Sequence, residues 1–386
     1  MNNIFDAIVV GAGFVGASVA YHLCTAGVKT ALFDRGLCAA AASGANFGNI
    51  QIMGMELEKS VEMVTLAAKK FDTLEQELDY SVGLRRIGGL LLIQDEERWH
   101  SLEKRLRVIR SAGIQAEMLQ ADRLREIEPL IAPAGLLGGF YHAREGQVDP
   151  FRFIWGHLQR ARQRGLKEFY NEEVIGFKVK GEQVEGIQTA KGITYAETVV
   201  LCTGARTRLL AKMLGRDWGL SHILGQAMVT EPVPPVLHNY IASASFFKRT
   251  GENAEKGKVV TNFSFSQSPY GHLLLGEAMY EADHFRKDVP YASLPEVCES
   301  AARYFPSFRK LRVLRSWSTP VAHTADNCPL LGPVAGLCGL ILATAFQSTV
   351  IIAPLIGEAV MQLVTSGKCG FNIAGFSPER GQAREH

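Results

Sequence analysis

Hydrophobic residues near the start of the chain follow two different patterns. Residues 4–10 form an almost continuous apolar run, broken only by Asp6, which predicts a buried strand. A glycine-rich turn and a helix over about 13–26 follow, Gly27 ends the helix, and residues 29–34 predict a second strand. We expect the two strands to be parallel neighbours, because such a crossover is right-handed.

Longer amphipathic stretches come next. Apolar residues spaced by three and four predict one long helix over 55–79 and another over 95–112. A short apolar run at 88–93 predicts a strand between them, and a further helix is expected at 151–164. The first half of the chain therefore mixes helices with strands.

The second half of the chain is richer in strands. Short strands are expected at 167–170, 174–180, 183–189 and 192–195, with a separate apolar strand at 198–202. Residues 222–318 show strand and turn signals throughout, and the polar tract 248–258 is typical of an exposed hairpin tip. A strand at 340–344 and a helix over about 349–365 complete the pattern.

The composition is that of a globular protein with a large core. The chain has 386 residues, of which 47% are hydrophobic and 21% charged. This length favours two domains that share a cleft. The net charge of +2 gives no strong field to attract nucleic acid, so we expect no nucleic-acid partner.

The cysteines and the apolar runs bear on the cellular location of the protein. Seven cysteines without C-x-x-C spacing are typical of a reducing compartment, and predict neither a metal site nor an iron–sulfur cluster on this chain. The first strand starts near Ile4, and glycine or proline interrupts the longest apolar runs, so we expect no signal peptide and no transmembrane segment. A cytoplasmic location is expected, with peripheral attachment to the inner membrane as the alternative.

The glycine-rich turn carries the first chemical signal. Gly11, Gly13 and Gly16 form a G-x-G-x-x-G pattern between the predicted strand and helix. The first glycine allows a tight turn, the second lets the backbone approach a diphosphate, and the third lets helix and strand pack closely. The diphosphate would lie on the helix N-terminal amides. Asp34 ends the second strand, where a carboxylate accepts from ribose hydroxyls.

Three further features favour FAD over NAD as the dinucleotide. The apolar strand that leads into Thr203–Gly204 returns the chain to the cofactor late in the sequence. Small residues at 43–48 permit close approach of an isoalloxazine ring. The last strand–helix turn offers a second helix N-terminus, whose dipole suits the negative charge of a reduced flavin.

These segments resemble the D-amino-acid oxidase superfamily of FAD enzymes, which includes glycine oxidase, sarcosine oxidase and D-amino-acid dehydrogenase. The matching stretches are the glycine fingerprint, Ala42–Asn46, Arg86–Leu90, Glu145–Pro150, Cys202–Ala205, Gly225–Gln226 and Asp326–Gly332. We expect an α/β FAD-binding domain of Rossmann-like, glutathione-reductase type, made of 1–81, 146–221 and 323–386. Residues 82–145 and 222–322 should form an α+β substrate domain with a large antiparallel sheet.

The resemblance implies a set of cofactor contacts and a reaction. FAD should contact Gly11, Ala12, Gly13, Phe14, Val15, Gly16, Asp34, Arg35, Ser43, Gly44, Asn46, Gly48, the backbone of Val174, Thr203, Gly204, Phe346, Gln347, Ser348, Thr349 and Val350. The chemistry of the family is hydride transfer from a C–H beside nitrogen to flavin N5. The imine product is then hydrolysed to a carbonyl compound and an amine.

Two departures from the family narrow the hypothesis. Val321 stands where many members carry the arginine that binds the substrate carboxylate bidentately. The Gly-His of the final turn is replaced by Phe346–Thr349, which implies non-covalent FAD. In both respects the chain resembles the flavin (beta) subunits of hetero-oligomeric L-proline and D-hydroxyproline dehydrogenases, hydrogen cyanide synthase and opine oxidases. There a second subunit carries another nucleotide and sometimes an iron–sulfur cluster.

The substrate side is less sharply defined by the sequence. Gln51, Met53, Gln226, Tyr270 and Tyr280 are candidates to line the cleft. His323, near the position of the missing arginine, could bind a carboxylate or hold a proton, or be an ordinary loop histidine.

Three functions stay open at this point. The first is an amine or imino-acid dehydrogenase that works as one subunit of a complex. The second is a stand-alone glycine, sarcosine or D-amino-acid oxidase that passes electrons to O₂. The third is a non-catalytic flavin- or NAD-binding subunit. No side chain is assigned as a catalytic base.

Overall fold

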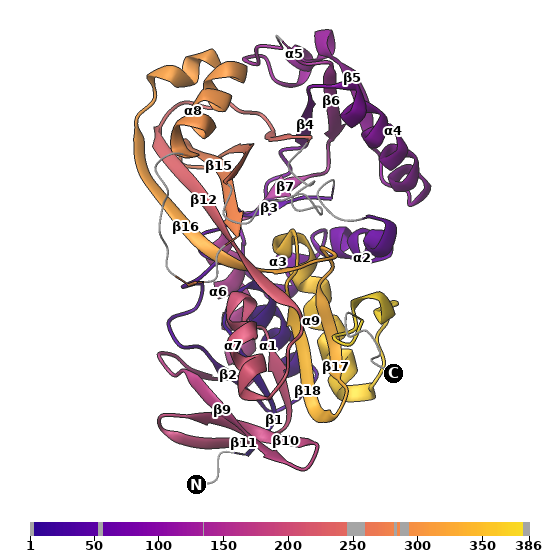
Figure 1. Ribbon diagram of the computed structural model, residues 1–386, viewed down its shortest axis with the longest axis vertical. Helices are drawn as coiled ribbons and strands as arrows, with labels where there is room; N and C mark the ends of the chain where they lie inside the picture. Colours follow the sequence, from indigo (N-terminus) through magenta and orange to yellow (C-terminus); the bar gives the residue numbers. More distant parts are fainter. Residues whose placement is uncertain are drawn as a thin grey trace.

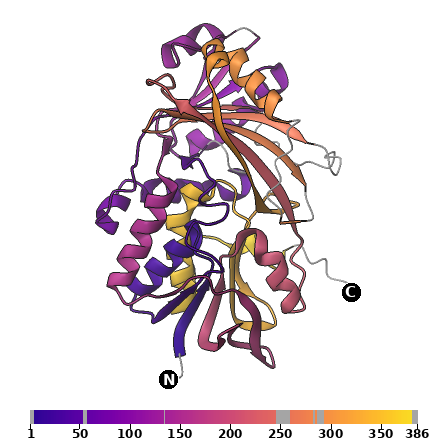
Figure 2. The ribbon, with the colours of Figure 1, turned by 90° about the vertical axis from the view of Figure 1, so that its left-hand side faces the viewer.

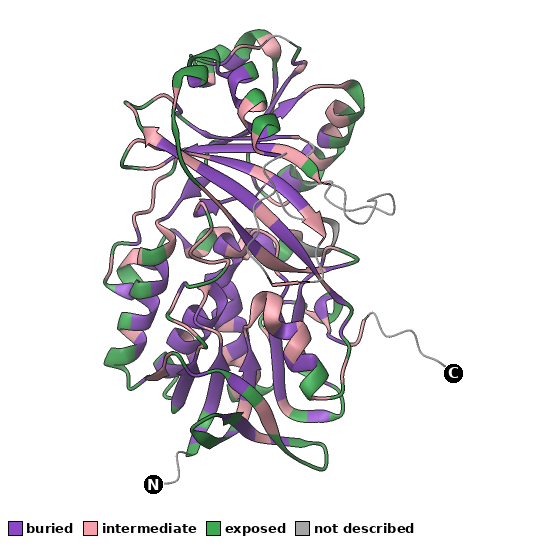
Figure 3. Ribbon diagram, turned by 60° about the vertical axis from the view of Figure 1, so that its left-hand side comes forward, coloured by how far each residue is buried: buried purple, intermediate pink, exposed green. Residues whose placement is uncertain are grey.

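Two eight-stranded sheets lie one above the other along the longest axis of the molecule in the computed structural model (Figures 1 and 2). The structure describes residues 4–52, 57–133, 135–244, 259–281, 284–285 and 293–380. Both sheets are mostly buried, whereas exposed residues gather on the outer helices and loops (Figure 3). Residue 53, the candidate Met53, and the tract 248–258 lie outside the described residues.

The lower sheet has a parallel centre. Its strand order is β17 (Leu330–Val334), β18 (Leu337–Thr344), β10 (Gln183–Thr189), β11 (Gly192–Leu201), β1 (Ile4–Val10), β2 (Thr30–Phe33) and β8 (Lys167–Phe169), with β9 (Val174–Lys180) paired to β10. Strands β18, β11, β1, β2 and β8 run parallel. The predicted strand–helix–strand unit is confirmed as β1, α1 (Phe14–Thr25) and β2.

The upper sheet is antiparallel except where β13 pairs with β4. Its order is β16 (Val313–Thr324), β12 (Leu220–Pro232), β15 (His272–Glu281), β14 (Val260–Gln267), β13 (Tyr240–Ser243), β4 (Gly89–Ile93), β6 (Gly138–His142) and β5 (Glu117–Gln120). A two-stranded sheet, β3 (Asn49–Ile50) with β7 (Gly146–Gln147), is separate from both. The predicted fold class, a Rossmann-like domain with a second domain built on an antiparallel sheet, is confirmed; the exact domain boundaries stay a prediction.

The remaining helices cover these sheets. They are α2 (Leu57–Lys70), α3 (Leu74–Leu78), α4 (Glu96–Ser111), α5 (Leu124–Ile127), α6 (Pro150–Gln163), α7 (Thr207–Met213), α8 (Ser293–Tyr304) and α9 (Thr349–Ser366). Helices α1 and α9 pack closely, and α2 and α6 lie against them.

Three elements differ from the sequence prediction. The helix expected over 55–79 is divided into α2 and α3, and between them Asp72 accepts hydrogen bonds from Arg86 and Arg144 at 3.0 and 2.8 Å. The strands expected at 192–195 and 198–202 are one strand, β11, because it pairs with β10 at its start and with β1 along most of its length. Helix α8 lies within a stretch that was expected to be strands and turns.

Helix α9 corrects the expectation that glycine or proline interrupts the longest apolar runs. Its 18 residues have a mean hydropathy of 1.6, so its length and composition alone would allow it to cross a membrane. Pro354 and Gly357 do not interrupt it. At Gly357 a side chain would lie 2.2 Å from Ser18 Oγ of α1, so this glycine permits the two helices to approach closely. More than half of α9 is buried inside the fold, as in the core helix of a globular protein.

Two buried histidines and the half-buried His22 predict how the stability of the protein depends on pH. Burial lowers the pKa of His22 and His142 to about 4, with nearby lysine or arginine side chains adding to the effect, and it lowers the pKa of His157 to about 3. In the unfolded chain each would have a pKa of about 6.5. The unfolded state therefore binds more protons between about pH 6.5 and 4, and stability is lost as the pH falls through this window.

We expect the free energy of unfolding to decrease by several kcal/mol from pH 6.5 to 4, because each pKa unit corresponds to about 1.4 kcal/mol. Denaturant titrations across this range will measure it. The variant His157→Leu should show a flatter profile, since His157 is fully buried on α6. A wild-type profile that is level over the window would contradict the expectation.

Candidate cofactor and substrate site

The glycine turn after β1 forms a cradle that side chains would fill. Gly11 has a φ of +104°, and a Cβ there would lie 2.5 Å from the carbonyl oxygen of Cys202. A Cβ at Gly16 would lie 1.7 Å from the Gly11 oxygen. Helix α1 begins at Phe14, with Gly13 as its N-cap. The positive N-terminal end of α1 therefore lies at the glycine turn, where a helix N-terminus can bind a diphosphate.

Polar side chains surround this cradle. Asp34 accepts from the backbone N–H of Ala12 at 2.7 Å and of Gly36 at 2.8 Å, which fixes its carboxylate beside the turn. Ser43 Oγ accepts from the N–H of Phe14 at 3.1 Å. A carboxylate oxygen accepts more than one hydrogen bond, so Asp34 can also receive a ribose hydroxyl. The donors and acceptors match a dinucleotide.

Other predicted cofactor residues lie at the same end of the lower sheet. Thr203 and Gly204 follow Cys202 at the end of β11, and Thr203 Oγ1 lies 2.8 Å from Thr207 Oγ1. Val174 is buried at the start of β9. Arg35 lies 3.7 Å from the carboxylate of Glu173. The remaining ones form the loop between β2 and β3, in which Asn46 accepts from the N–H of Gly48: Ser43, Gly44, Asn46 and Gly48.

The turn before α9 faces a cavity of about 210 Å³. Ala345 and Ser348 have left-handed backbone conformations, with φ of +59° and +46°, which turn the chain from β18 into the helix. All five residues predicted there line this cavity: Phe346, Gln347, Ser348, Thr349 and Val350. The positive end of the α9 dipole therefore points toward the cavity.

The opposite wall of the cavity is one face of the upper sheet. Strands β12 and β16 pair in register, with Ile223, Gly225 and Ala227 opposite Val321, Thr319 and Trp317. All six line the cavity. Trp317 Nε1 donates to the carbonyl of Ala45 at 3.0 Å, which ties this wall to the cofactor loop.

The substrate-side candidates separate into two groups. Gln51 and His323 line the cavity. Gln226 borders it, but its side-chain oxygen accepts from Ser293 Oγ at 2.6 Å. Tyr270 and Tyr280 do not line this cavity. Tyr270 is 72% exposed on the turn between β14 and β15, and it borders a neighbouring cavity of about 790 Å³. Tyr280 lies near the end of β15 and is not among the residues that line the first cavity.

Asn327 connects the two sides of the cavity. Its Oδ1 accepts from His323 Nε2 at 2.7 Å and from Gln347 Nε2 at 3.0 Å. The residue has a φ of +58°, a left-handed conformation that asparagine tolerates better than most residues. Because Asn327 Oδ1 only accepts, His323 carries a proton on Nε2, and in the neutral ring Nδ1 is an acceptor. Asn327 thus fixes the orientation of both side chains.

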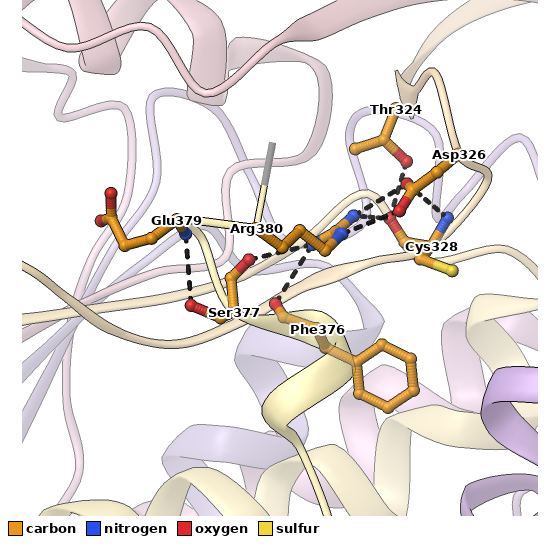
Figure 4. A network of polar contacts seen from close by, with 7 residues as sticks. All are labelled: Thr324, Asp326, Cys328, Phe376, Ser377, Glu379 and Arg380. Atoms are coloured by element: carbon orange, nitrogen blue, oxygen red, sulfur yellow. Dashed lines mark hydrogen bonds and ion pairs between the residues drawn. The ribbon is translucent and has the colours of Figure 1, made fainter. Parts of the chain in front are cut away.

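A second network holds the turn that carries Asn327 (Figure 4). Arg380 binds the Asp326 carboxylate through Nε at 2.9 Å and Nη2 at 3.0 Å, and Nη2 also donates to the carbonyl of Cys328 at 2.6 Å. Thr324 Oγ1 donates to the same carbonyl at 2.6 Å. Partial burial alone would raise the pKa of Asp326, but the hydrogen bonds from Arg380 and Cys328 outweigh it and lower the pKa to about 2.

Sequence reasoning missed several residues of the site. Trp317 and Thr319 alternate along β16 with Val321 and His323, which were already named, and this alternation was a readable signal for a shared face. Glu277 on β15 and the role of Asn327 gave no such signal, because each depends on a local irregularity of the backbone. Among the residues that the structure describes, no group of three or more His, Cys, Asp or Glu side chains is placed to hold a metal ion.

The fold and the cradle are those of a dinucleotide-binding protein. The family described as FAD dependent oxidoreductase matches residues 6–363, and the chain belongs to this family. The predicted resemblance is confirmed, and with it FAD as the cofactor of an oxidoreductase. FAD would supply the two-electron acceptor when it is bound.

Individual relatives are distant. The chain is 24% identical to mitochondrial dimethylglycine dehydrogenase of Rattus norvegicus over 97% of this chain, but spans only 44% of that protein. It is also 24% identical to sarcosine oxidase subunit beta of Rhodobacter capsulatus, covering 87% of this chain and 80% of the relative. The structure of L-proline dehydrogenase from P. horikoshii superposes with a TM-score of 0.89 at 22% identity, covering 98% of both chains, which shows a shared fold.

Proposed function

We propose that this chain is the catalytic subunit of a hetero-oligomeric dehydrogenase that oxidises a small amino acid, imino acid or opine-like secondary amine. The observation that carries the proposal is the cavity between the α9 turn and the β12–β16 face, in which Val321 stands where a carboxylate-binding arginine would be expected. A relative named as a beta subunit of sarcosine oxidase supports a subunit role.

The proposed reaction needs few groups from the protein. The neutral amine loses a hydride from the carbon beside nitrogen and a proton from nitrogen, and the resulting imine takes up water to give a carbonyl compound and an amine. Gln51, Gln347 and His323 offer polar atoms to orient the substrate. The second subunit would carry another nucleotide or an iron–sulfur cluster and would receive the electrons.

The test is anaerobic mixing of the purified holoprotein with a panel of amino acids, imino acids and opines. We expect one class to bleach the flavin absorption, and dye reduction to rise when the partner subunit is co-expressed. Steady-state peroxide production by the isolated chain would instead support a stand-alone oxidase. A flavin that no amine in the panel reduces would leave a non-catalytic flavin-binding subunit and overturn the proposal.

A further inference from the structure

One carboxylate lies within the cavity wall. Strand β15 contains a bulge opposite β12, where Gln226 pairs with Ala278 and Ala227 pairs with Gly276, so that Glu277 is the extra residue. A bulge of this kind redirects a side chain. The Glu277 carboxylate extends over the neighbouring strand, and its Oε1 lies 3.2 Å from where a Cβ of Gly225 would be. Gly225 therefore leaves room for the carboxylate on the cavity face.

A hydroxyl lies beside the same position. Thr319 on β16 is the direct cross-strand partner of Gly225 and lines the cavity. It is only 9% exposed, and its Oγ1 has no hydrogen-bond partner within the described part of the chain. Buried hydroxyls in proteins almost always have a partner. A ligand that hydrogen-bonds to both Glu277 and Thr319 would satisfy this group.

The charged side chains that line the cavity also bear on which ligand it binds. Glu277 is the single Asp, Glu, Lys or Arg among the described residues that line it. With Val321 in place of the expected arginine, the sheet wall that carries Glu277 favours a cation over an anion, whereas the positive end of the α9 dipole acts at the opposite wall. The reacting amine itself must be neutral to release a hydride, and a nearby carboxylate would keep it protonated. The cation beside Glu277 therefore belongs to a different nitrogen of the substrate.

We propose that Glu277 and Thr319, flanking Gly225, form a subsite for an ammonium or guanidinium group of the substrate. The inference rests on the proposed amine oxidation and narrows its substrate to amines that carry a second, cationic nitrogen. A carboxylate and a hydroxyl match the several N–H donors of such a group.

The test separates binding from turnover by using ligands that are not oxidised. Butylguanidinium and its neutral isostere butylurea are titrated into the holoprotein, and the change in flavin absorption and calorimetry give the dissociation constants. We expect butylguanidinium to bind at least about tenfold more tightly than butylurea. Glu277→Gln should bring this ratio close to one with unchanged flavin content, and Thr319→Val should reduce it about fivefold.

The matched control is Glu185→Gln, which removes a carboxylate from β10 of the other sheet and should keep the wild-type ratio. Equal binding of the two ligands by the wild type, or a preference that survives Glu277→Gln, would overturn the subsite. Flavin reduction by amines with no preference for a second cation would also overturn it and leave the proposed function intact. A cation preference in a protein that oxidises no amine would support the subsite and refute the proposed function.

Discussion

The variant Gly16→Ala should purify with at least about tenfold less flavin than the wild type and with a free energy of unfolding lower by about 1–3 kcal/mol. An added Cβ would lie 1.7 Å from the Gly11 carbonyl oxygen, and no side-chain rotation relieves a contact between backbone and Cβ. Helix α1 must therefore move away from the turn, which separates the amides that would hold the diphosphate.

The absorption ratio of flavin to protein and thermal unfolding measure the two effects. Gly375→Ala is the matched control, because a Cβ at that position meets nothing within 4 Å. The control should keep the flavin content and stability of the wild type. Full flavin content in Gly16→Ala would show that the cradle is not where the cofactor is held.

The variant Asn327→Gly should lower kcat/KM by up to about a hundredfold while flavin content stays unchanged. Glycine accepts the left-handed backbone of this position, so the change removes the side-chain oxygen without adding strain. His323 and Gln347 then lose their shared acceptor, at 2.7 and 3.0 Å, and with it their fixed orientation toward the cavity.

Stopped-flow reduction of the flavin by the best substrate of the panel provides the measurement. Asn327→Asp keeps an acceptor oxygen and should recover most of the lost activity, which a purely structural role of the turn would not predict. If Asn327→Gly reduces the flavin as fast as the wild type, the two side chains do not need this acceptor.

Local patterns carried most of the fold prediction. The β1–α1–β2 unit follows from a buried strand, three glycines and an acid that are close in sequence. The α9 turn was likewise predicted from a strand followed by a helix. The break between α2 and α3 could not be predicted, because the partners of Asp72 are Arg86 and Arg144, which the chain brings near only after folding.

The substrate side shows where sequence reasoning ends. Its face on β16 follows the period of two, whereas His323 was predicted from its place near the missing arginine. Tyr270 has the size and polarity of a cleft residue, but a tight turn places it on the surface. Glu277 depends on a bulge whose position is set by two neighbouring strands, so no local pattern marks it.

The clamp between Arg380 and Asp326 has a practical consequence. Arg380 belongs to the last stretch of chain that the structure describes, yet it fastens the turn from which Asn327 reaches into the cavity. Proteolytic clipping ahead of residue 380, or an affinity tag that pulls this segment away, would slow turnover while leaving the yellow colour. Preparations of the enzyme should therefore be compared by intact mass before their rates are.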